Sequence, residues 1–365
     1  MSEDPNYYTW LQLLQERTIT RKEGELKVVT KRIPELDQEG VLDPRVLNIN
    51  KSMQFEHAEH LELNAPSSLA QIRASMGWPN TDLSSGVDTV ERQIIGTEAE
   101  ITVRIYTPSV EGLKPAIVFF HGGGFIGGSL KTVENPCKGL AEKAGAVVIS
   151  VDYRLAPEHP FPAGLTDCWD TVVWVHEHAE QLEVNRDWIA VAGDSAGGNL
   201  SAVCSIIDRE KGTDYIKYQA LIYPTVCMAA VNPYFSWSID QYTISEQAEL
   251  MTGIVMGLAP KEHNAILNLY VQSKVDAQHP HVSPIFYEHV DQLPTTLIVT
   301  AEYDGLKIEG KAYAARLAAA GVDTTYICYK GMDHAFMDKY GLYPQAEDLM
   351  TEIAAGFKSV IAKYS

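Results

Sequence analysis

The 365-residue sequence is poor in basic residues, has no long apolar run and holds few cysteines. Its 29 Lys and Arg stand against 48 Asp and Glu, a formal net charge of -19 at pH 7. Such a balance opposes binding to nucleic acid or to an anionic membrane surface. No apolar run approaches the roughly 18 residues that cross a bilayer, and the initial MSEDPN lacks the basic start and apolar core of a secretory signal. We therefore expect a soluble, cytoplasmic protein without nucleic-acid or membrane partners.

The cysteines are too few and too scattered for a disulfide framework. There are five, with no CxxC pair among them: Cys137, Cys168, Cys204, Cys227 and Cys328. A dispersed, odd-numbered set is typical of buried, reduced thiols in a reducing compartment. The sequence also lacks an HExxH motif and any Cys/His cluster, so we expect neither a metal nor another cofactor.

The sequence does contain many short apolar runs rich in β-branched and aromatic residues. We expect strands at 89–96, 100–107, 115–120, 146–151, 188–192, 218–223, 295–300 and 324–329. Helix-compatible stretches lie between them, among them 137–143, 167–177, 199–211 and 307–320. Continuous apolar strands are typical of sheets covered on both faces. The alternation predicts an α/β fold with a mostly parallel central sheet flanked by helices.

Two regions interrupt this rhythm, because neither contains a run that resembles a buried strand. We expect residues 1–85 to form the N-terminal part of a helical cap and residues 227–278 to form a cap insertion. The α/β core would then comprise 86–226 and 279–365. Open α/β sheets bind ligands at the carboxyl edge of their strands, where such a cap would lie. Alternatively, the N-terminal region is only a packing arm.

The strongest chemical signal is GDSAG at 193–197, between the strand expected at 188–192 and the helix expected at 199–211. In this context a G-x-S-x-G serine lies on a strained turn, and the two glycines relieve the crowding of nearby backbone. The start of the helix then stabilises negative charge. The alternative is a glycine-rich turn without a catalytic role, but the flanking elements favour Ser195 as a nucleophile.

A second signal, HGGGF at 121–125, follows the strand expected at 115–120. Consecutive glycines let backbone N–H groups face a ligand oxygen, which suits an oxyanion hole. A flexible loop or a phosphate cradle are the alternatives, although a phosphate loop would end in Gly-Lys-Ser/Thr, which is absent here. We expect His121 to support the loop by hydrogen bonding and not to act as the base.

The candidate base and acid lie in two later loops. His334 follows the last expected strand, and Asp304 follows the strand at 295–300. The order Ser195, Asp304, His334 is the order of nucleophile, acid and base in α/β-hydrolases.

Two other carboxylates, Glu302 and Asp333, compete with Asp304 for the role of the acid. Asp333 precedes His334 directly, and neighbouring side chains of an extended loop point apart. Glu302 lies closer to the strand end, where it could act as a support or pair with a basic residue. We therefore favour Asp304.

Four segments together give a specific resemblance: HGGGF at 121–125, VDYRLAPEHPFPA at 151–163, GDSAGGN at 193–199 and DHAF at 333–336. Over about residues 115–336 the chain resembles the hormone-sensitive-lipase group (bacterial family IV) of α/β-hydrolase esterases. The resemblance implies Ser195, Asp304 and His334 as the catalytic triad, with Gly123, Gly124 and Ala196 as oxyanion-hole donors. The chain departs from the group's usual pattern in its acidic loop, DGLKIE at 304–309, and at Ala335, where glycine is commoner.

These features predict a serine carboxylesterase that hydrolyses short- to medium-chain acyl esters through an acyl-enzyme. An amidase or a sugar-acetyl esterase would use the same triad. A non-catalytic ligand receptor of the same fold is a further alternative, but receptors of this kind lack the histidine that is present here as His334. The partner expected is a small ester, and the resemblance also implies a possible homodimer paired through an edge strand.

Overall fold

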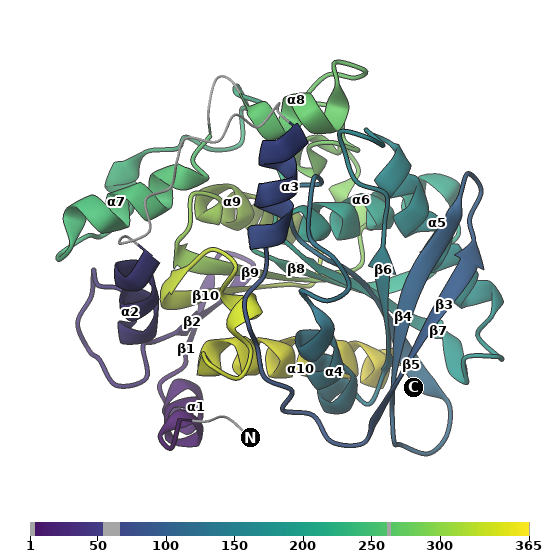
Figure 1. Cartoon of the computed structure of the whole chain (residues 1–365), viewed down its shortest axis with the longest axis horizontal. Helices are drawn as coiled ribbons and strands as arrows, with labels where there is room; N and C mark the ends of the chain where they lie inside the picture. Colours follow the sequence, from purple (N-terminus) through teal and green to yellow (C-terminus); the bar gives the residue numbers. More distant parts are fainter. Residues whose placement is uncertain (1–3, 54–65, 261–263, 365) are drawn as a thin grey trace.

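The computed structural model describes residues 4–53, 66–260 and 264–364, in which helices cover both faces of one ten-stranded sheet (Figure 1). The strand order is β1-β2-β10-β9-β8-β7-β5-β6-β4-β3. The strands are β1 (Ile19–Glu23), β2 (Leu26–Lys31), β3 (Val87–Ile95), β4 (Glu100–Pro108), β5 (Lys114–Phe120), β6 (Val147–Asp152), β7 (Val184–Asp194), β8 (Ile216–Ile222), β9 (Thr295–Tyr303) and β10 (Thr324–Asp333). From β2 to β6 in this order all neighbours are parallel, whereas β1–β2, β6–β4 and β4–β3 are antiparallel.

The α-helices are α1 (Tyr7–Glu16), α2 (Pro44–Met53), α3 (Pro66–Ser75), α4 (Glu134–Ala144), α5 (Ala163–Glu177), α6 (Ala196–Lys211), α7 (Ala248–Gly257), α8 (Ala265–Val271), α9 (Lys307–Ala319) and α10 (Pro344–Tyr364). Short 3-10 turns are η1 (Ile239–Gln241), η2 (Pro284–Phe286), η3 (Val290–Gln292) and η4 (Phe336–Lys339). Helices α4 and α10 lie on one face of the sheet, and α5, α6 and α9 on the other (Figure 1). Among the described helices, none is both long and apolar enough to cross a membrane.

Strand β5 shows why the central strands are continuous apolar runs. Ile117 and Phe119 pack with α4 and α10, whereas Val118 and Phe120 pack with α5 and α6 on the opposite face. Successive strand residues point to opposite faces, and both faces are covered here, so every position of β5 except the partly exposed Pro115 is buried. The α/β architecture predicted from these runs is confirmed, and all eight expected strands are present.

The N-terminal region departs from the prediction of a purely helical cap. Strands β1 and β2 form a hairpin that extends the main sheet, with β2 parallel to β10. Every β1 residue is exposed, and the strand has the sequence ITRKE. It therefore contains no apolar run from which a buried strand could be predicted. Of the helices of this region, α3 lies beside α8 and α2 lies below α7 (Figure 1). Residues 1–3, 54–65 and 261–263 of the two expected cap regions lie outside the described residues.

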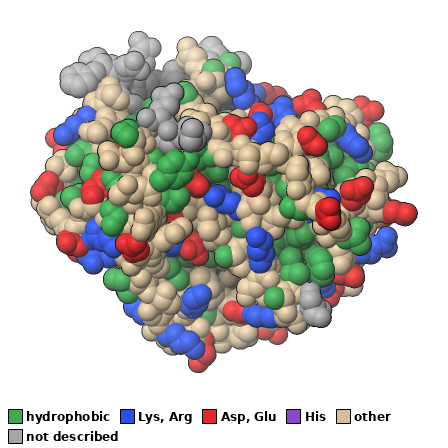
Figure 2. Space-filling view, turned by 90° about the horizontal axis from the view of Figure 1, so that it is seen from below, with side chains coloured by type: hydrophobic (Ala, Val, Ile, Leu, Met, Phe, Trp, Pro, Cys, Tyr) green, Lys and Arg blue, Asp and Glu red, His purple; other side chains and the backbone are tan. Residues whose placement is uncertain are grey.

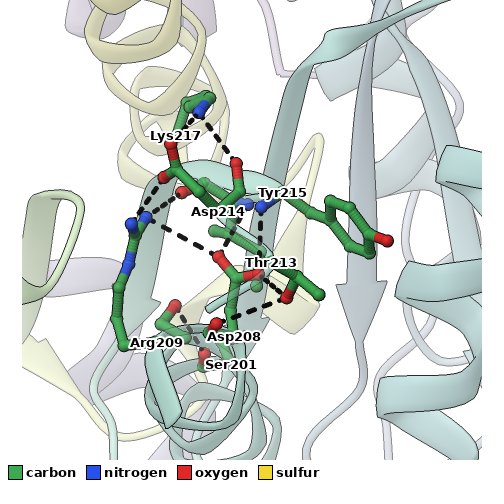
Figure 3. A network of polar contacts seen from close by, with 9 residues as sticks. Ser201, Asp208, Arg209, Thr213, Asp214, Tyr215 and Lys217 are labelled. Atoms are coloured by element: carbon green, nitrogen blue, oxygen red, sulfur yellow. Dashed lines mark hydrogen bonds and ion pairs between the residues drawn. The ribbon is translucent and has the colours of Figure 1, made fainter. Parts of the chain in front are cut away.

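A buried carboxylate joins the end of α6 to the start of β8 (Figure 3). Asp208 Oδ1 accepts hydrogen bonds from Thr213 Oγ1 at 2.6 Å and from the Tyr215 N–H at 2.9 Å. Its Oδ2 accepts one from the Ile216 N–H at 3.0 Å. The donors are backbone and hydroxyl groups that would be costly to leave unpaired in the interior. Asp208 thus fixes the far end of the helix that starts next to Ser195.

The surface does not concentrate its excess negative charge on the face that Figure 2 shows. Lys and Arg side chains are interleaved there with Asp and Glu. Ion pairs also mix the two signs locally: Arg104 pairs with Glu91 and Glu134, and Lys138 pairs with Asp82 and Glu134. The charge of this face is therefore distributed and not gathered into a field of one sign.

Candidate active site

Ser195 lies in the sharp turn between β7 and α6, with φ 55° and ψ -114°. An L-residue pays a strain cost for such a conformation. The Ser195 N–H donates to the Ile222 carbonyl of β8 at 2.8 Å, which holds the turn in place. A Cβ on Gly193 would lie 2.6 Å from the Phe120 carbonyl oxygen, and one on Gly197 would collide with the same atom. The crowding expected of this turn is therefore real, and it requires glycine on both sides of the serine.

His334 brings its imidazole to this serine from the loop after β10. Its Nε2 lies 3.0 Å from Ser195 Oγ, and its Nδ1 lies 2.6 Å from Asp304 Oδ2. The Asp304 side chain is fully buried, whereas 22% of the His334 side chain stays exposed. Next to the histidine, Ala335 has φ 58°, a left-handed conformation that favours glycine. The three residues expected to act together thus form a continuous chain of contacts.

The other two carboxylates considered for the acid contact different groups. Glu302 bonds the Lys330 ammonium and accepts a hydrogen bond from the Gly331 N–H at 2.9 Å, so its expected pairing with a basic residue is confirmed. Asp333 Oδ2 accepts a hydrogen bond from Asn50 Nδ2 at 3.1 Å. Burial raises the pKa of Asp333. Of the three candidates, Asp304 is the one with a hydrogen bond to the imidazole.

The glycine loop after β5 folds back beside the serine with positive φ at Gly123 (124°) and Gly124 (62°). Asp194 anchors it, because its Oδ1 accepts the Gly122 N–H at 2.8 Å. The described part of the chain offers no hydrogen-bond acceptor to the N–H groups of Gly123, Gly124 or Ala196. These three N–H groups therefore have no protein acceptor among the described residues.

His121 supports the glycine loop, as expected. Its Nδ1 lies 2.8 Å from the Gly122 carbonyl oxygen, and its ring stacks on Tyr153 with 4.4 Å between centroids. The Tyr153 hydroxyl in turn donates to the His121 carbonyl at 2.7 Å. Burial lowers the pKa of His121 to about 4, so the imidazole is neutral at pH 7. It is part of the loop's scaffold.

Negative groups surround the His334 imidazole. Burial alone would lower its pKa, but Asp304, followed by Asp194 and Asp338, outweighs burial and raises the pKa above its ordinary value. Burial raises the pKa of Asp194 to about 7, and the neighbouring Asp338 adds to this. The centroid of the Tyr223 ring lies 4.7 Å from the centroid of the His334 imidazole. The sequence signals did not single out Asp338 or Tyr223, because nothing in their local pattern marks their approach to the histidine.

Residues of α3 and α8 that the sequence did not single out contact the glycine loop and the segment beside it. On α3, Arg73 Nε donates to the Ile126 carbonyl at 2.6 Å and its Nη2 donates to the Ala156 carbonyl at 3.0 Å. On α8, Tyr270 stacks on Phe125 with 3.8 Å between ring centroids. These contacts join segments that are 53 or more residues apart, so no local motif could have shown them.

Comparison with known proteins agrees with this fold. A family model of the alpha/beta hydrolase fold matches residues 117–338. Esterase LipI of Mycobacterium tuberculosis is 31% identical over 318 residues, which cover 86% of this chain and 93% of the relative. The chain belongs to the alpha/beta hydrolase family.

Further similarities within this family agree on the class of enzyme. Carboxylesterase NlhH of Mycobacterium tuberculosis is 34% identical over 277 residues, covering 74% of this chain and 83% of the relative. The solved structure of a hyperthermophilic esterase from the archaeon Pyrobaculum calidifontis has a TM-score of 0.72 at 34% identity, covering 88% of this chain and 99% of that one. This alpha/beta hydrolase is a carboxylic ester hydrolase of the serine type.

Proposed function

We propose that Ser195, His334 and Asp304 carry out ester hydrolysis. Ser195 is the nucleophile, His334 is the general base, and Asp304 is the carboxylate that orients the imidazole and stabilises its positive charge. The observation that supports this most directly is the pair of contacts of His334, 3.0 Å to Ser195 Oγ and 2.6 Å to Asp304 Oδ2. His334 takes the hydroxyl proton as Ser195 Oγ attacks the ester carbonyl carbon, and it then gives this proton to the leaving alcohol. Water, activated by the same imidazole, releases the acid from the acyl-enzyme.

We assign the oxyanion hole of this hydrolase to the N–H groups of Gly123, Gly124 and Ala196. The negative charge of the tetrahedral intermediate develops on the former carbonyl oxygen, and preorganised N–H donors stabilise it without reorganising. Asp194 supports this role, because its bond to the Gly122 N–H fixes the loop that presents two of the three donors.

The proposed substrates are esters whose acyl chains have about two to eight carbons. Each CH₂ that fits an apolar pocket gains only about 0.8 kcal/mol, which does not offset the exclusion of a longer chain by the walls of the site. Bulky groups confine the space beside the glycine loop. Phe125 is stacked on Tyr270, and a Cβ on Gly124 would lie 3.3 Å from Ile266 Cδ1 of α8. Such walls favour short acyl chains.

We expect nitrophenyl esters of C2 to C8 acids to be hydrolysed faster than the C16 ester. The measurement is kcat/KM over the acyl series, with the matching anilides assayed beside it to test the amidase alternative. Faster turnover of C16 with interfacial activation would indicate a true lipase, and comparable rates on anilides would indicate an amidase.

The pH profile tests the histidine base. Because His334 must be neutral to accept a proton, kcat/KM should rise with pH through the pKa of this group. Asp304 raises that pKa, so the midpoint should lie at or above about 6.5, the usual value for histidine. The profile is measured between pH 5 and 8 with circular dichroism at each pH as a control for folding. A flat profile from a folded protein would contradict a histidine base.

A cytoplasmic location and a homodimer complete the proposal. All five cysteines are free, which supports a reducing compartment. The strands at the two ends of the sheet are β1 and β3. An edge-paired homodimer would use one of them, and light scattering of the purified protein measures whether it forms.

A further inference from the structure

The loop that carries Asp304 is held by side chains from the insertion between β8 and β9. The Tyr242 hydroxyl donates to the Asp304 carbonyl at 2.8 Å, and Trp237 Nε1 donates to the Gly305 carbonyl at 2.9 Å. In the opposite direction, the Tyr303 hydroxyl donates to the Thr243 carbonyl at 3.0 Å. Three hydrogen bonds therefore join residues 237–243 to the acid loop, which we define as residues 303–307.

Backbone packing reinforces these bonds. A Cβ on Gly305 would lie 2.5 Å from the Ala259 nitrogen and would collide with the carbonyl carbon of Leu258. These two residues directly follow α7, so the end of this helix rests against the acid loop. The contact leaves the loop little room to move towards the end of α7.

Lys307 lies against the face of the Tyr242 ring. Its Nζ lies 3.7 Å from the centroid of the Tyr242 ring, a distance at which a cation is attracted to the face of an aromatic ring. Burial lowers the pKa of Lys307 and raises that of Tyr242, and the phenol therefore keeps the proton that it donates to Asp304. The hydroxyl and the ring of Tyr242 thus both contact the acid loop.

We propose that Tyr242 and Trp237 are positioning residues for ester hydrolysis, because their hydrogen bonds orient Asp304 and, through it, the imidazole of His334. The insertion then completes the catalytic centre in addition to covering it. This inference rests on the proposed role of Asp304 as the acid. Small displacements matter here, since a misplacement of about 1 Å can cost about 100-fold in rate.

Tyr242→Phe tests the inference because it removes one hydroxyl and keeps the ring over Lys307. We expect kcat to fall about 5- to 20-fold with KM within about twofold, as for the loss of one buried hydrogen bond that aligns a catalytic group. The acid-limb midpoint of the pH profile should also move down, because a looser Asp304 stabilises the imidazolium less. Trp237→Phe should act in the same direction. A purely structural role would change Tm and leave the pH midpoint in place.

Tyr234→Phe is the matched control. This tyrosine belongs to the same insertion, but its ring contacts Phe286 and Arg316 and not the acid loop. The control should keep wild-type kcat, KM and pH midpoint.

The same change in an Asp304→Asn background separates this inference from the proposed function. Tyr242→Phe should add almost nothing there, because groups that act through one another are not additive. An unchanged kcat and pH midpoint in Tyr242→Phe and Trp237→Phe, or an undiminished loss in the Asp304→Asn background, would overturn the positioning role alone. Full activity of Asp304→Asn by itself would overturn the proposed acid, and this inference with it.

Discussion

Replacing Ser195 with alanine should lower kcat by about 10⁴- to 10⁶-fold while the protein remains folded. The hydroxyl supplies the atom that attacks the carbonyl, and the remaining groups can only bind and polarise the ester. Alanine should fit the turn, since φ 55° strains an alanine about as much as the unbranched serine that it replaces. The measurement is hydrolysis of a short-chain nitrophenyl ester, with Tm recorded for both proteins.

Ser205→Ala provides a control for the loss of a serine hydroxyl from α6, the helix that Ser195 directly precedes. The Ser205 hydroxyl donates to the Ser201 carbonyl at 3.1 Å, within α6, and makes no contact with His334. This variant should keep its activity. A Ser195→Ala protein that retains more than about a tenth of wild-type activity would be incompatible with the nucleophile assignment.

Asp304→Asn should cost about 10²- to 10⁴-fold in kcat, because a neutral amide can stabilise the wrong tautomer of the imidazole. The 2.6 Å contact from Asp304 Oδ2 to His334 Nδ1 is the bond that this change alters. Glu302→Gln and Asp333→Asn should each cost much less, since their carboxylates bond Lys330 and Asn50. The three variants are compared by kcat and by Tm.

Repeating Asp304→Asn in a Ser195→Ala background sharpens this comparison. An acid that acts only through the triad should add almost nothing once the nucleophile is gone. An independent loss in that background, or a larger loss from Glu302→Gln than from Asp304→Asn, would assign the acid elsewhere.

The sequence by itself determined the central strands and the turn of the nucleophile. Residues 115–120 are apolar because both faces of β5 are covered. A strand buried on both faces can therefore be predicted from its continuous apolar run. The glycines at 193 and 197 also mark the turn in the sequence, although the carbonyl that excludes a Cβ there belongs to Phe120 of β5 and is brought close only by the fold. The sequence thus shows the strand and the turn, and the fold supplies the reason for the glycines.

Only the tertiary structure decided which groups meet. Strand β1 is fully exposed and charged, and it became visible only through its pairing with β2, which in turn pairs with β10. The sequence favoured Asp304 over Glu302 and Asp333, but only distances show which of them contacts the imidazole, because all three lie in or just after the ends of the neighbouring strands β9 and β10. Tyr242 lies 62 positions from Asp304, and no periodicity extends over such a separation. A local pattern records how deeply a segment is buried, whereas contacts between loops depend on how the whole sheet brings their ends together.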